Sequence, residues 1–312
     1  NMLNMWILYA SIYATIIGFF TVLKKKATEK TNTLFVLAFH STLGFLLLSW
    51  TAFFDALKIS PQSILFLLIK SVIVAFMWIF ELIALKKYYI SSLQPISSIK
   101  VVIGFVAGII IFSEPFVWWK CIGVAIIFVG LIMLNLYDKK HIVKFEPAKN
   151  NLQATPTLTP DEQQQLKRNR ITAIILFLLS CILSEASAIL DKFILTNVSP
   201  NQMQFWFMMF VSIILWICFF ASCIKNKKML VSKSDFKNFY IYLIACILIV
   251  ADRFLFTSLS QPDVLVSGVS VIKQISIIVS VIFGGLWFKE PKLKNKLIFL
   301  AIILAGIIIV LI

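Results

Sequence analysis

Ten apolar stretches, each of roughly 20 residues, recur along this 312-residue chain and constrain its fold more than any other feature. At about 1.5 Å of rise per residue, a helix of that length crosses a hydrocarbon core about 30 Å thick. Charged residues make up 14% of the chain, against about a quarter in a typical soluble domain. The sequence therefore predicts an all-α membrane protein with ten transmembrane helices.

A polar segment divides the ten stretches into two groups of five. We expect helices at about 3–23, 33–54, 62–85, 91–112, 117–137, 171–195, 201–224, 238–259, 264–287 and 295–312. Residues 138–170 are rich in Gln, Asn, Thr, Pro and charge, and they lack the apolar content needed to form a core. We predict a first five-helix repeat at 2–137, a polar linker at 138–170 and a second five-helix repeat at 171–312.

Two short motifs occur at matching places in the two groups. Residues 97–100 read SSIK and a Glu-Pro pair follows at 114–115, while residues 270–273 read SVIK and a Glu-Pro pair follows at 290–291. This is an internal repeat. Because five is an odd number, the second copy enters the membrane from the side opposite to the first. Such inverted repeats are typical of secondary transporters, whose sites lie near the bilayer midplane.

Lysine and arginine are distributed unevenly between the connections. Connections after odd-numbered helices hold 22 of these residues, whereas connections after even-numbered helices, with the adjoining helix ends, hold three. Basic residues mark the cytoplasmic side, so we predict a cytoplasmic linker and two outward-facing termini in a bacterial inner membrane. The same bias accounts for the net charge of +15 without a nucleic-acid partner.

The sequence offers no cluster typical of a metal site or an enzyme. The five cysteines form no CxxC pair and do not cluster with the two histidines, His40 and His141. There is no HExxH motif and no nucleophile beside a base. We therefore expect no metal and no cofactor, and we consider an intramembrane enzyme the less favoured class.

The ten-helix layout, the Glu-Pro pairs and the glycine-spaced last helix of each half resemble the drug/metabolite transporter superfamily, specifically its EamA-like branch. The resemblance covers the chain outside the linker. It implies a membrane transporter, surrounded by lipid, that carries a small solute by alternating access. In the pattern common to this branch both termini face the cytoplasm, whereas the basic residues here predict the reverse orientation.

Ionisable residues inside the predicted helices are the candidate site. Such a residue costs roughly 2.5–3.5 kcal/mol at the middle of a membrane helix, so it normally faces a cavity or a partner. Lys100 and Lys273 lie near the midplane at matching places of the two repeats. Inversion predicts that they face each other across one cavity, where two ammonium groups suit an anion.

These lysines also resemble residues of nucleotide-sugar and triose-phosphate transporters, in which lysines of the fourth and ninth helices bind the substrate phosphate. Lys273 with the adjoining Gln274 is similar to the ninth-helix position, and Lys100 is similar to the fourth-helix position. The resemblance implies that these three residues contact an anionic substrate.

The remaining candidates lie in other predicted helices. They are, for substrate binding, Tyr13, His40, Ser97, Asp252 and Arg253, and, for proton coupling, Glu81 and Glu185. Asp252 and Arg253 point about 100° apart on one helix, so one is expected to face the cavity and the other a neighbouring helix. A structural alternative is that the lysines pair with the three acids and only neutralise one another.

We predict a secondary-active transporter of a small metabolite that carries a phosphate or carboxylate group. Two alternatives remain open. One is an exporter of cationic or zwitterionic amphipathic metabolites, anchored by Glu185 and Asp252. The other is a flippase, or a structural assembly subunit, in which the interior cations hold a lipid phosphate. The expected partners are a small solute, membrane lipid and a coupling proton.

Overall fold

The computed structural model describes residues 5–113, 116–141, 160–227, 231–261, 264, 266–290 and 292–311, and every regular element within them is a helix. Ten segments in this part of the chain are long and apolar enough to cross a membrane. The predicted all-α fold with ten membrane-spanning segments is therefore confirmed.

The first half contains four continuous spans and one broken span. The continuous helices are α1 (Met5–Ala27), α2 (Thr33–Ala56), α3 (Pro61–Lys87) and α6 (Trp118–His141). The fourth span consists of α4 (Ile90–Leu93), the 3₁₀ helix η2 (Gln94–Ser98) and α5 (Ile99–Phe112).

The second half repeats this pattern. Its continuous helices are α7 (Pro160–Ile194), α8 (Pro200–Lys225), α9 (Phe239–Leu259) and α12 (Leu293–Leu311), and the short η4 (Asp235–Lys237) precedes α9. The ninth span is divided into α10 (Val266–Ile272) and α11 (Ile275–Trp287). Each half thus has its break in its fourth span.

Several helices begin at side chains that bind the otherwise unpaired N–H groups of a first turn. Asn32 accepts hydrogen bonds from the amides of Leu34 and Phe35 at the start of α2. Ser199 forms a capping box with Gln202 at the start of α8, with Pro200 between them. These starts follow from the local sequence, whatever surrounds the helices.

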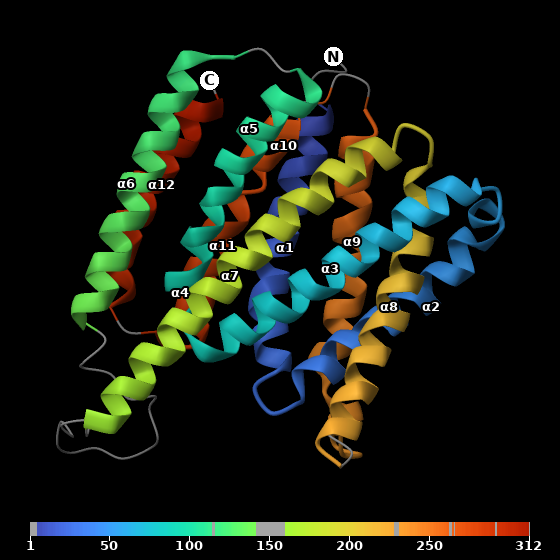
Figure 1. Ribbon diagram of the computed structural model, residues 1–312, viewed down its shortest axis with the longest axis horizontal. Coiled ribbons are helices and arrows are strands. Elements are labelled where there is room, and N and C mark those ends of the chain that lie inside the picture. The colour runs from blue at the N-terminus through green and yellow to red at the C-terminus, as the bar shows by residue number, and fades with distance from the viewer. Residues whose placement is uncertain are drawn as a thin grey trace.

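Helices of one half pack against helices of the other half. The set of partners stays the same when each helix is replaced by its counterpart in the other half. The main partners are α1 with α9, α3 with α7, α2 with α8, and α6 with α12. In Figure 1, α6 and α12 lie side by side at the left edge, and both chain ends lie opposite the end where α6 finishes and α7 begins. We call this latter end the linker face; it also carries the α1–α2, α3–α4 and α11–α12 connections.

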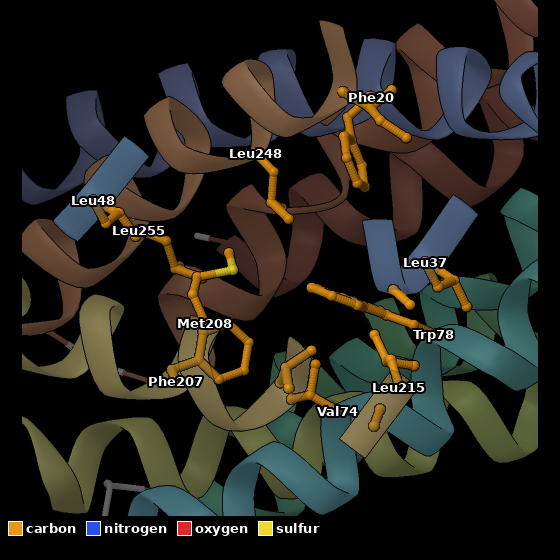
Figure 2. Packing of buried hydrophobic residues seen from close by; sticks show 14 of the residues in the cluster. Phe20, Leu37, Leu48, Val74, Trp78, Phe207, Met208, Leu215, Leu248 and Leu255 are labelled. Carbon is orange, nitrogen blue, oxygen red and sulfur yellow. The ribbon is translucent and has the colours of Figure 1, made fainter. Parts of the chain in front are cut away.

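The main apolar core lies between α1, α2, α3, α8 and α9. Figure 2 shows Phe20 and Leu248 on one side of this region, with Trp78, Val74 and Phe207 on the other. All five side chains also line the cavity described below. The core therefore forms part of the wall of the candidate site.

Two sequence-based expectations need correction. The fourth and ninth helices were predicted to be continuous, but both are broken, the fourth next to Pro95, which lacks a backbone donor. The predicted linker at 138–170 is also partly helical, because α6 continues to His141 and α7 begins at Pro160. Residues 160–162 read Pro-Asp-Glu, which favours a helix start because proline suits the first helical position and acids suit the first turn.

Candidate functional site

A cavity of about 160 Å³ lies between the two halves. Residues of α1, α3, the two broken spans, α7, α8 and α9 line it. Its charged lining residues are the lysines Lys24, Lys70, Lys100 and Lys273 and the acids Glu81, Asp191 and Asp252. Seven ionisable side chains at one internal cavity make this the candidate site.

The breaks in the fourth and ninth spans place Lys100 and Lys273. Lys100 lies in the first turn of α5, directly after η2, and Lys273 lies between α10 and α11. The turn at Lys273 is tight, because the amide of Gln274 bonds to the carbonyl of Val271 at 3.0 Å. The side chain of Gln274 stabilises it further by donating to the carbonyl of Ser270 at 2.8 Å.

Two of the four lysines are held by acids. The Nζ of Lys24 lies 2.5 Å from a carboxylate oxygen of Glu81, joining α1 to α3. The Nζ of Lys70 lies 2.8 Å from Asp191, joining α3 to α7. Each of these charges is thereby neutralised within the protein.

The other lysines and one acid remain without such a partner. Among the described residues, neither Lys100 nor Lys273 forms an ion pair within 4.0 Å, and Asp252 forms neither an ion pair nor a hydrogen bond. Lys273 lies 5.9 Å from the ring centroid of Tyr13, which is within the range of a cation–π contact. The cavity therefore presents two ammonium groups and one carboxylate.

Glu185 lies next to this cavity and is not one of its lining residues. Its side chain is buried, with 1% of the residue exposed, and it accepts a hydrogen bond of 3.0 Å from the hydroxyl of Ser270 on α10. Gly104 on α5 leaves room for this contact, because a Cβ there would lie 2.9 Å from that hydroxyl oxygen and 3.3 Å from the carboxylate. Glu185 thus lies where α7, α5 and α10 meet.

Three other predicted residues line the cavity. Tyr13 does so from α1, and Ser97 and Gln274 do so from the broken spans. The hydroxyl of Ser97 donates to the carbonyl of Gln94 at 2.6 Å, so it is already engaged within its own helix. Glu81, predicted as a coupling residue, lines the cavity as the partner of Lys24.

His40 and Arg253 do not reach the cavity. His40 is fully buried behind Phe20 and Trp78, and its Nδ1 hydrogen-bonds the carbonyl of Val36 at 2.8 Å. Arg253 is exposed on α9, because the 100° step along a helix turns it outward when its neighbour Asp252 faces inward. We therefore leave both residues out of the candidate site.

Sequence analysis missed Lys24 and Asp191. Lys24 was assigned to a connection, but α1 continues to Ala27. Tyr13, Ile17, Phe20 and Lys24 recur at the spacing of one helix face, and all four line the cavity. Ser184, Ser187, Ala188 and Asp191 show the same spacing on α7. Extending the helical period beyond the apolar stretch would have revealed Lys24, and following the period within the predicted helix 171–195 would have revealed Asp191.

Comparison with known proteins agrees with the ten-span, two-repeat fold. The model of the EamA-like transporter family matches the chain twice, over residues 4–136 and 171–312. A solved structure titled "Crystal structure of protein" is similar in fold, with a TM-score of 0.62, 12% sequence identity and coverage of 95% of each chain. No curated protein matches the chain.

Proposed function

Because this chain belongs to the EamA-like transporter family, we propose that it carries a small phosphate- or carboxylate-bearing metabolite across the membrane by alternating access. The observation that carries the proposal is the pair of lysines, Lys100 and Lys273, that line one internal cavity without an acidic partner. They lie at matching breaks of the two repeats. Sites of inverted-repeat transporters lie at such breaks.

The charge balance supports an anion. A buried charge without a partner is unfavourable, because little water is present to solvate it. After the two internal ion pairs are set aside, Lys100 and Lys273 line the cavity with one acid, Asp252. Glu185, buried next to the cavity, balances the second lysine when it is ionised. When Glu185 is protonated, an anionic ligand supplies the missing negative charge. It would bind strongly because charge-assisted hydrogen bonds are stronger than neutral ones.

The volume of the cavity supports a small soluble solute over a lipid. The cavity measures about 160 Å³ in this conformation. Ligand pockets for larger metabolites are usually about 300–1,000 Å³. The flippase alternative would require a much larger cavity than this conformation provides.

Asp252 supports a second candidate, a zwitterionic solute. Its carboxylate is largely buried at the cavity, and among the described residues it has no cationic partner. A ligand with an ammonium group near Asp252 and an anionic group near the lysines would neutralise all three side chains. This reading retains the anion site and adds a cation site.

A thermal-shift screen of the purified protein against anionic, zwitterionic and cationic metabolites tests both candidates. Ligand at 100 times its Kd stabilises a folded protein by about 2.7 kcal/mol. We expect anions or zwitterions to raise the melting temperature of the parent and of the control Lys58→Gln, an exposed lysine, but not of Lys100→Gln/Lys273→Gln. Equal stabilisation of the double variant, or stabilisation by cations alone, would contradict the proposal.

We also propose that Glu185 couples proton movement to transport, in preference to Glu81. Glu81 is neutralised by Lys24, whereas Glu185 has, within the described chain, a serine hydroxyl as its hydrogen-bond partner. The assay follows uptake, into proteoliposomes, of a metabolite found by the thermal-shift screen. An imposed pH gradient should accelerate uptake by the parent and by Glu29→Gln. It should leave the rate of uptake by Glu185→Gln unchanged. A full response of Glu185→Gln to the gradient would rule out this role.

A further inference from the structure

Glu290 belongs to the Glu-Pro motif that recurs in both halves, and the cavity does not use it. It lies between α11 and α12 on the linker face. Only 7% of the residue is exposed. A buried carboxylate needs compensating donors, so its contacts indicate what it does.

The carboxylate of Glu290 binds the start of α4, about 200 residues away in the sequence. One oxygen accepts from the amide of Ile90 at 2.7 Å, and the other accepts from the amide of Ser91 at 2.9 Å and from the Ser91 hydroxyl. The Nζ of Lys25 lies 3.6 Å from the first oxygen. Hydrogen bonds of this kind, with a charged acceptor, are roughly twice as strong as neutral ones.

Lys296 on α12 strengthens the same junction. Its ammonium donates to the hydroxyls of Ser91 at 2.9 Å and Ser92 at 2.7 Å. Lys296 and both serines are buried. Two side chains of the second repeat thus bind consecutive residues of the first repeat.

This junction lies at the linker-face end of the broken fourth span, which carries Lys100. From Ser91 the chain continues through Gln94 and Ser97, which line the cavity, to Lys100. Alternating access in inverted-repeat transporters moves one repeat against the other around a fixed site. Such a motion would separate the α11–α12 connection from α4 when the linker face opens.

We propose that Glu290 is a releasable latch: its hydrogen bonds to Ile90 and Ser91 hold the linker face closed, and they break before the cavity opens to that face. The latch rests on the alternating-access part of the proposed function and is independent of the solute. Its donors are backbone amides and a hydroxyl, which water can replace once the repeats separate. The contact can therefore form and break in each cycle.

Solvent access to residue 97 from each face tests the latch without any substrate. Ser97→Cys introduces a thiol into the cavity lining, and a membrane-impermeant methanethiosulfonate modifies it in right-side-out and inside-out vesicles. Mass spectrometry of the peptide that contains residue 97 gives the rate despite the native cysteines. A second cysteine at position 150 of the linker identifies the vesicles that expose the linker face.

We expect Glu290→Gln to raise the modification rate from the linker face by about fivefold or more, because weakening a charge-assisted bond shifts the population toward the open state. From the opposite face the rate should not rise. The control is Glu29→Gln, an exposed glutamate on the same face that pairs with Lys26 at 2.7 Å, and its rate should match the parent.

Three results would overturn the latch: an unchanged rate in Glu290→Gln, an equal rise from both faces, or the same rise in Glu29→Gln. Gel filtration and melting curves establish that each variant is folded. If Glu290→Gln does not fold, Lys296→Gln, which removes the bonds to Ser91 and Ser92, is measured instead. An unchanged modification rate of residue 97 in Lys296→Gln would equally exclude a releasable contact. Failure of both variants to fold would also exclude it.

Discussion

Lys70 illustrates how a single charge is accommodated inside this protein. Its side chain is 2% exposed and forms an ion pair with Asp191, whose side chain is 6% exposed. Its ammonium also lies 4.1 Å from the ring centroid of Phe207 and 4.5 Å from that of Phe256. The carboxylate and the two ring faces replace the lost hydration. Lys70 is therefore part of the structure of the cavity wall, in contrast to Lys100 and Lys273.

Removing one member of this pair should destabilise the protein strongly. Lys70→Met or Asp191→Asn should each lower the free energy of unfolding, Lys70→Met by about 3–5 kcal/mol because it leaves a buried carboxylate uncompensated. The double variant Lys70→Met/Asp191→Leu should recover most of the loss. Unfolding of the purified proteins in detergent measures all three, and a double variant as unstable as Lys70→Met would contradict this account.

At this scale the sequence predicted that Lys100 and Lys273 face a cavity, but it did not predict Lys24 or the surroundings of these lysines. Lys100 and Lys273 were recognisable because each interrupts an apolar stretch within a repeated motif. Asp191 was missed because it lies near the end of its helix, where a charge is unremarkable. Which lysine pairs with which acid depends on packing between helices, and a one-dimensional pattern does not contain that information.

Helices α6 and α12 approach each other closely at two glycines. A Cβ on Gly123 would lie 2.7 Å from the carbonyl oxygen of Gly306 and 2.6 Å from a methyl group of Val310. A Cβ on Gly306 would likewise lie 2.7 Å from the carbonyl of Gly123. Small residues allow such approach between membrane helices, where van der Waals packing drives association.

Gly123→Ala should therefore separate α6 from α12 and lower stability by about 1–3 kcal/mol, the usual cost of overpacking. Gly44→Ala is the matched control, because its new Cβ would meet nothing closer than the sulfur of Met208 at 3.6 Å. That variant should be as stable as the parent or more stable, since alanine is the better helix former. Melting temperatures in detergent measure the difference, and equal values for the two variants would show that the contact is not tight.

Hydropathy predicted the ten spans because length and apolar content alone determine whether a helix can cross a bilayer. It did not predict the breaks, which depend on details within the apolar stretch. Pro95 was a visible signal in the fourth span. The ninth span has no proline in its described residues, and at its break the side chain of Gln274 donates a hydrogen bond to the carbonyl of Ser270.

For the whole molecule, the paired contacts of the two halves agree with the inverted repeat inferred from the SSIK and SVIK motifs. The start of α1 and the end of α12 lie on one face, as Figure 1 shows, and the end of α6 and the start of α7 lie on the other. The distribution of lysine and arginine supports our proposal that the linker faces the cytoplasm. Labelling of a linker cysteine by an impermeant reagent in intact cells would contradict that orientation.

The central proposal is that Lys100 and Lys273 together bind the anionic group of the solute. The structure of the protein in complex with a metabolite found by the thermal-shift screen tests it most directly. We predict that the phosphate or carboxylate lies between the two ammonium groups, within ion-pair distance of both. A ligand outside this cavity, or one whose anionic group contacts neither lysine, would contradict the proposal.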